Sequence, residues 1–79
     1  MLLNKVNIGS VVIIKKFNNS VDTIKRLNDM GITVGLKIKI IRKSPFLGAI
    51  EIKARDFYLV LRKQDACKIE VELWVLISV

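Results

Sequence analysis

The 79-residue sequence contains no histidine, one cysteine and one proline. A single cysteine, Cys67, excludes a disulfide within the chain, and without histidine no Ser–His or Cys–His catalytic pair can form. Zinc and similar metals need several Cys or His ligands, so we expect neither a metal site nor a cofactor. We therefore predict that the protein is not an enzyme, and that Cys67 is a small buried apolar residue.

Long hydrophobic runs are also absent, although 52% of the residues are hydrophobic. The longest runs, Phe57–Leu61 and Leu73–Ile77, have five residues each, whereas a membrane-spanning helix needs about 20. No positively charged region precedes a long apolar stretch at the N-terminus, so we expect no signal peptide. The expectation is a cytoplasmic protein with a single domain over residues 1–79.

Acidic residues are scarce, with 7 Asp and Glu against 14 Lys and Arg, which gives a formal net charge of +7. The imbalance lies in the first half of the chain. Residues 1–43 carry nine basic and two acidic residues, and residues 44–79 carry five of each. Such a basic face attracts acidic proteins, nucleic acid or anionic lipid. A solvated basic face without a specific ligand is about equally common.

One amphipathic helix of about eleven residues is predicted in the first half. Ser20 is its expected N-cap, and Gly31 is expected to follow its last turn, where a left-handed backbone favours glycine. Its apolar positions recur every three residues; they are Val21, Ile24, Leu27 and Met30. The segment Gly31–Gly35 is then a tight bend that sets the helix against the rest of the fold.

Five short strands are predicted around this helix. Val11–Phe17 is rich in β-branched residues, and period-2 alternation indicates three more strands, at residues 36–40, 50–54 and 69–73. Residues 58–61 follow a short hairpin turn and are predicted as the fifth strand. Leu3, Val6 and Ile8 indicate an N-terminal turn packed as a lid on the core. Short strands, tight turns and one inserted helix are typical of a mainly β protein, here a small, partly open, SH3-like β-barrel with the helix after the first strand.

Three stretches match a known family in order and spacing. They are Ile24-x-x-Leu27-x-x-Met30-Gly31-Ile32-x-x-Gly35-x-x-Ile38-x-Ile40, Pro45-Phe46-x-Gly48 followed by Ile50-x-Ile52, and Leu59-x-Leu61-Arg62-Lys63-x-Asp65-Ala66-x-x-Ile69-x-Val71. Over about residues 3–72 the chain resembles the ferrous iron transport protein A (FeoA) family, which implies an SH3-like barrel. Asp56 stands where the family usually has Gly in a hairpin turn, so we expect Asp56 to take the left-handed conformation.

The resemblance also implies a partner and a role. The partner is FeoB, a membrane protein that carries Fe²⁺ inward and bears a GTP-hydrolysing domain. The chain would then be a non-catalytic module of ferrous iron uptake that docks on the cytosolic domain of FeoB and modulates transport. It would be peripheral to the membrane through that partner.

Charge and exposure indicate which residues dock. We predict a basic helix and second strand beside an exposed loop; the residues are Lys25, Arg26, Lys37, Lys39, Arg42, Lys43, Phe46 and Leu47. An exposed aromatic beside charge is a common anchor, although Phe46 could equally fold back over the mouth of the barrel. The apolar extension 73–79 is expected to lengthen the last strand and pair two copies as a homodimer, through Leu73, Trp74, Val75, Leu76 and Ile77.

Two other functions compete with docking. A small basic barrel can bind nucleic acid non-specifically, but aromatics are only 6% of the sequence and do not line one predicted strand face as stacking platforms would. No nucleic acid partner is therefore expected. A direct iron carrier is the other candidate, because Glu70 and Glu72 share a strand face, but two surface carboxylates are more commonly solvated.

Overall fold

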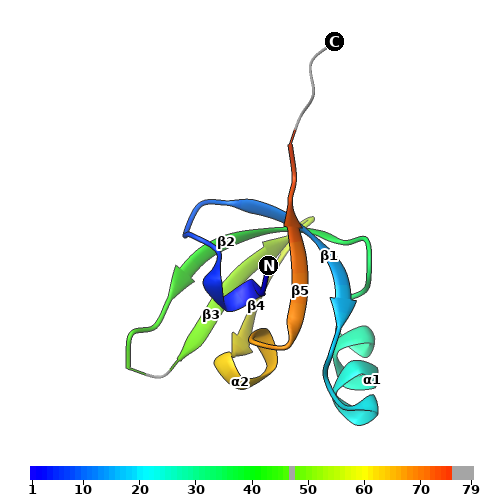
Figure 1. The fold of residues 1–79 in the computed structure, drawn as a ribbon. Helices are drawn as coiled ribbons and strands as arrows, with labels where there is room; N and C mark the ends of the chain where they lie inside the picture. Colours follow the sequence, from blue (N-terminus) through cyan, green and yellow to red (C-terminus); the bar gives the residue numbers. More distant parts are fainter. Residues whose placement is uncertain (47, 76–79) are drawn as a thin grey trace.

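Five antiparallel strands form one sheet in the order β4-β3-β2-β1-β5 (Figure 1). The computed structural model of the chain describes residues 1–46 and 48–75. The strands are β1 Val11–Phe17, β2 Lys37–Lys43, β3 Ala49–Ala54, β4 Phe57–Arg62 and β5 Ile69–Leu73. Three short helical elements accompany them: η1 Leu3–Lys5, α1 Val21–Asp29 and α2 Lys63–Ala66. The predicted mainly β, SH3-like class with a helix after the first strand is confirmed, but the sheet is open, with β4 and β5 as its edges.

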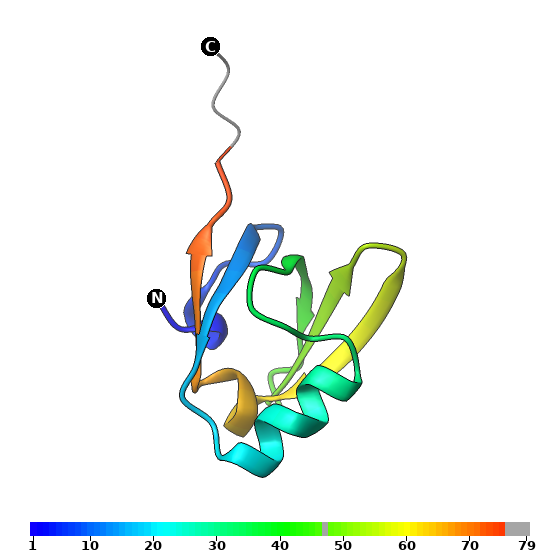
Figure 2. The same ribbon diagram turned by 90° about the vertical axis from the view of Figure 1, so that its right-hand side faces the viewer.

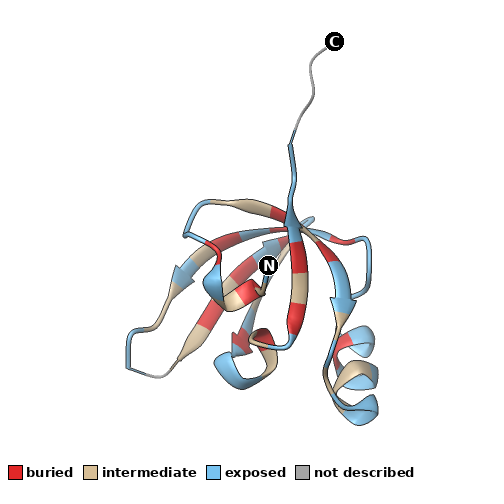
Figure 3. Cartoon of the chain, in the orientation of Figure 1, coloured by how far each residue is buried: buried red, intermediate tan, exposed pale blue. Residues whose placement is uncertain are grey.

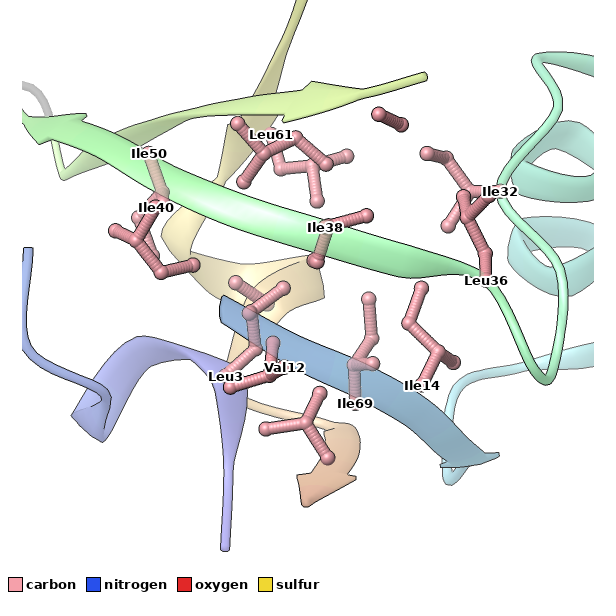
Figure 4. Close-up of a cluster of buried hydrophobic side chains, with 14 of the residues drawn as sticks. Leu3, Val12, Ile14, Ile32, Leu36, Ile38, Ile40, Ile50, Leu61 and Ile69 are labelled. Carbon is pink, nitrogen blue, oxygen red and sulfur yellow. The ribbon is translucent and has the colours of Figure 1, made fainter. Parts of the chain in front are cut away.

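The sheet bends around an apolar core. Extra residues interrupt the register between Ile14 and Lys16 in β1 and between Ile40 and Arg42 in β2, and such bulges increase bending and twist. In Figure 2 the β1–β5 and β3–β4 pairs form the two arms of the bent sheet. Figure 3 colours the buried residues along the ribbon, and Figure 4 shows buried side chains gathered into one cluster. The core residues are Leu3, Val6, Val12, Ile14, Leu27, Ile32, Leu36, Ile38, Ile40, Ile50, Ile52, Ala54, Leu61, Ala66, Ile69 and Val71.

Helix α1 has nine residues and is two residues shorter than predicted. Ser20 is its N-cap, because the Ser20 hydroxyl accepts a hydrogen bond from the Thr23 amide at 3.3 Å. The predicted apolar stripe is only partly covered: Leu27 is fully buried and Ile24 is half-buried, but Val21 is 82% exposed and Met30 is also exposed. The sheet therefore covers only part of the face that the spacing of apolar residues indicated.

The C-terminal end of α1 is closed by a Schellman motif. The Gly31 amide donates to the Asn28 carbonyl at 3.0 Å, and the Ile32 amide donates to the Leu27 carbonyl at 2.9 Å. Gly31 has a φ of +91°, as this motif requires. Leu27 and Ile32 are both fully buried, so the apolar contact that usually accompanies the motif is part of the core.

The predicted bend ends by joining β1. Gly35 also has a positive φ, and its amide donates to the Ile14 carbonyl at 2.8 Å. The Ile14 amide in turn donates to the Leu36 carbonyl at 3.0 Å. The segment Gly31–Gly35 therefore holds the end of α1 beside the middle of β1, which is the architectural role expected of it.

The N-terminal residues cover the β5 edge of the sheet. Leu2 pairs with Glu70, and the Val71 amide donates to the Met1 carbonyl at 2.8 Å. Leu3 is fully buried beneath this contact, so the predicted lid is present. Ile8 was expected to belong to the lid but is exposed, because the chain turns away from the core before β1 begins.

Residues 74 and 75 do not lengthen the last strand as predicted, and residues 76–79 lie outside the described residues. The strand β5 ends at Leu73, because β1, its only neighbour in the sheet, begins at Val11. The Trp74 amide still donates to the Val11 carbonyl at 2.9 Å, and beyond it no β1 residue remains to pair. Cys67 also differs from expectation: it is only half-buried, and its thiol donates to the Gln64 carbonyl at 3.3 Å.

The turn between β3 and β4 places Arg55 in the left-handed region, with a φ of +54°; the prediction for Asp56 was therefore wrong. A non-glycine residue costs about 1–2 kcal/mol in this conformation. We expect Arg55→Gly to raise the free energy of unfolding by about 0.5–1 kcal/mol, since the relieved strain exceeds the added chain entropy. Urea denaturation measures the change. The control Asp56→Gly should give no gain, and a gain at Asp56 alone would contradict this assignment.

Candidate docking surfaces

The structure divides the predicted docking residues among three separate regions. Lys25 and Arg26 lie on α1, Lys37 and Lys39 lie on the outer face of β2, and Arg42, Lys43 and Phe46 lie at or near the β2–β3 hairpin. Leu47 was predicted with them but lies outside the described residues. A partner that contacts one of these regions does not have to contact the other two.

Two of the predicted cations already have ion-pair partners. The Arg26 guanidinium lies 2.8 Å from the Asp65 carboxylate, so it ties α1 to α2. Arg42 lies 3.0 Å from Glu51, its cross-strand neighbour on β3. Exposed pairs of this kind contribute little to stability, but they reduce the charge that these two arginines present to a partner.

The β2–β3 hairpin presents an aromatic side chain to solvent. Phe46 is 95% exposed, so it does not fold back over the mouth of the barrel, and its role as a docking anchor stays a prediction. The Lys43 ammonium donates to the Asn4 carbonyl at 3.2 Å, which fixes the base of the hairpin to η1. A shallow pocket of about 270 Å³ lies beside it, lined by Asn4, Lys43, Ser44, Pro45, Gly48, Ala49, Ile50 and Lys63.

A second hollow, of about 220 Å³, lies between α1 and β4. Its lining combines apolar side chains with two arginines: Arg26, Leu27, Met30, Val60, Leu61, Arg62 and Asp65. Sequence reasoning missed it because the spacing of apolar residues does not tell which of them the rest of the fold leaves uncovered. The exposed Met30 and Val60 are what the incomplete covering leaves at the surface.

The outer face of the sheet carries a row of basic and aromatic residues that crosses the strands. Tyr58 on β4 pairs with Lys53 on β3, Lys53 pairs with Lys39 on β2, and Lys39 pairs with Val11 on β1. Trp74 continues the row, since its amide bonds the Val11 carbonyl. Lys53 and Tyr58 were not among the predicted residues.

Two lysines of this face lie over aromatic rings. The Lys37 ammonium is 4.3 Å from the centre of the Trp74 ring, and the Lys53 ammonium is 5.6 Å from the centre of the Tyr58 ring. Cation–π contacts at exposed sites contribute about 0.5–1 kcal/mol each. We call the set Lys37, Lys39, Lys53, Tyr58 and Trp74 the outer basic face.

The residues predicted to pair two copies are only partly described. Leu73, Trp74 and Val75 are exposed, whereas Leu76 and Ile77 lie outside the described residues. Because β5 ends at Leu73 and its edge is occupied by residues 1–2, a partner strand would have to pair beyond the sheet. Self-association through this segment stays a prediction.

Over residues 1–46 and 48–75, no group of three or more His, Cys, Asp or Glu side chains is placed to hold a metal ion. The same residues include no helix long and apolar enough to cross a membrane.

Comparison with known proteins gives concordant matches. Residues 1–73 match the family model of the FeoA domain. The chain is 30% identical over 73 residues to the Fe(2+) transport protein A/Fe(2+) transporter FeoB fusion protein of Porphyromonas gingivalis. That match covers 92% of this chain but only 9% of the relative's length.

Solved structures agree with the family match. The FeoA-like protein of Clostridium acetobutylicum is 32% identical with a TM-score of 0.83, and the match covers 99% of this chain and 91% of that one. The FeoA protein of Chlorobium tepidum is 25% identical with a TM-score of 0.87, covering 95% of this chain and 71% of that one. The chain therefore belongs to the FeoA family, which is associated with ferrous iron transport.

Proposed function

We propose that the chain is a non-catalytic cytoplasmic module that docks on the cytosolic domain of a FeoB-type ferrous iron transporter and modulates Fe²⁺ uptake. The fusion protein of Porphyromonas gingivalis carries the proposal, because it joins a region similar to this chain to the transporter on one polypeptide. Joining two modules raises their effective concentration to about the millimolar range, which makes a weak contact between them effective. A module on a separate polypeptide lacks this gain in effective concentration, so its own docking surface has to supply the affinity for the transporter.

Phe46 is the docking anchor that the structure supports best. It is the most exposed of the large apolar side chains described, and it follows Lys43, the last residue of β2, by three positions in the chain. Aromatic residues near charge dominate the energetics of many interfaces. The absence of histidine from the sequence supports a binding role over acid–base catalysis.

Titration of the full 79-residue chain with the FeoB cytosolic domain of the same organism tests this function. We expect saturable binding, followed by backbone chemical shifts, and about tenfold weaker binding for Phe46→Ala. Val21→Ala is the matched control, because it also removes an exposed apolar side chain but from α1. No binding at tens of micromolar, with GDP and with a GTP analogue alike, would overturn the proposal.

A further inference from the structure

The three lysines of the outer basic face are placed at a cost in stability. Lys39 and Lys53 are direct cross-strand partners, and like charges in such positions repel each other. Lys37 lies two residues along β2 and is also exposed. A sheet that served only stability would place a carboxylate or a neutral side chain at one of these positions.

The carboxylates nearest to this face form ion pairs with basic residues outside the set. Glu51 is bound by Arg42 at 3.0 Å, and Glu72 lies 3.5 Å from Lys15. None of the three lysines is within ion-pair distance of a carboxylate of the described residues. Their positive charge is therefore available to an external anion.

Apolar and aromatic side chains lie at the margin of the same face. Trp74 lies under the Lys37 ammonium, with the exposed Leu73 and Val75 on either side of it in the chain, Val75 at 69% exposure. Figures 1 and 2 show that this segment leaves the sheet at the end opposite α1 and α2. Tyr58 is 59% exposed at the other end of the row. Tyr and Trp favour membrane–water interfaces, where the ring is partly buried and its polar atom stays hydrated.

The choice of lysine indicates which anion fits. Lysine is depleted at the centres of protein–protein interfaces, and paired recognition of phosphates in nucleic acid favours the planar fork of arginine. Lipid headgroups are mobile and need only a set of point charges in roughly one plane. Near an anionic membrane each lysine raises the binding constant by about fivefold.

We propose that the outer basic face, together with Leu73–Val75, binds the surface of an anionic lipid bilayer. The lysines contact the headgroups, while Trp74 and its two apolar neighbours enter the interfacial layer. This proposal does not rest on docking to FeoB, and it gives the chain a membrane contact of its own.

Binding of the full chain to lipid vesicles at about 0.1 M salt, where the Debye length is about 10 Å, tests the proposal. Trp74 is the only tryptophan, so its fluorescence reports on this surface alone. We expect the emission to shift to shorter wavelength with vesicles of phosphatidylcholine and phosphatidylglycerol in equal parts, and not with phosphatidylcholine alone. The triple variant Lys37→Gln, Lys39→Gln, Lys53→Gln should lower the vesicle binding constant by about a hundredfold, because three fivefold factors multiply.

A matched control separates this face from general charge. Lys5→Gln, Lys25→Gln, Lys68→Gln removes three exposed lysines elsewhere and leaves the same net charge of +4, which is +7 less three. This control variant should weaken vesicle binding by less than about threefold. Trp74→Ala is assayed by vesicle sedimentation, and it should weaken binding at least as much as the loss of one lysine of the outer basic face.

Three results would overturn the proposal: no shift with anionic vesicles, equal weakening by both triple variants, or a shift that grows with protein concentration without lipid, which would indicate self-association. Lysine-dependent binding of single-stranded RNA or of the FeoB domain without vesicle binding would overturn it as well.

Discussion

Replacing Leu27 with Ala is expected to lower the free energy of unfolding by about 3 kcal/mol. Leu27 is the one residue of α1 that is fully buried, and its carbonyl also receives the Ile32 amide of the Schellman motif. A nine-residue helix is too short to persist without tertiary contacts. The truncation therefore removes both the anchor of the helix and the partner of Ile32 in the core.

Urea denaturation measures the loss, and amide exchange shows where it falls. The amides of α1 should exchange faster in Leu27→Ala than those of β2 and β3, because the helix can separate while the sheet persists. The control Val21→Ala removes an apolar side chain from the same predicted stripe but should change stability by less than about 0.5 kcal/mol. Equal losses for the two variants would contradict the observed packing of α1.

The order of elements could be predicted from the sequence because each signal is local. Alternation of apolar and polar residues along β2 and β3 follows from the geometry of a strand, and Ser20 and Gly31 mark the ends of α1 by the chemistry of their own backbone neighbours. The covering of α1 is not a local property. It depends on where the sheet ends, so the spacing of apolar residues alone does not predict that Val21 and Met30 are exposed.

The candidate sites show the same division. Alternation placed Lys37 and Lys39 on a polar face, but only the register of β2 with β3 brings Lys53 opposite Lys39. The register of β2 with β3 depends on the bulge between Ile40 and Arg42. No residue type at these positions predicts that bulge. The missed residues Lys53 and Tyr58 could have been found by assuming a simple hairpin between β3 and β4, because the turn at Arg55 fixes that pairing.

Long-range pairing also decided which charges remain available. Arg26 and Asp65 are separated by 39 positions in the sequence, yet they form an ion pair at 2.8 Å. Counting charges in the first half of the chain treated Arg26 and Lys37 as equivalent. The structure separates them, because the guanidinium is bound to a carboxylate and the ammonium lies over an indole ring.

Replacing Leu3 with Ala is expected to be the second large loss of stability, again about 3 kcal/mol. Leu3 is fully buried although it is the third residue of the sequence. Its neighbours Met1 and Leu2 pair with β5, so the side chain holds in place the segment that covers this edge of the sheet. The loss is a large fraction of the roughly 5–15 kcal/mol that stabilises a typical domain.

An uncovered strand edge pairs readily with another chain, so Leu3→Ala should also self-associate more strongly than the wild type. Urea denaturation gives the stability, and sedimentation over a range of concentrations gives the association. Ile8→Ala is the control, since Ile8 lies in the same N-terminal segment but is exposed; it should leave both quantities unchanged. If Leu3→Ala loses stability yet sediments as the wild type does, then residues 1–2 hold the β5 edge without help from Leu3, and the lid acts only through burial.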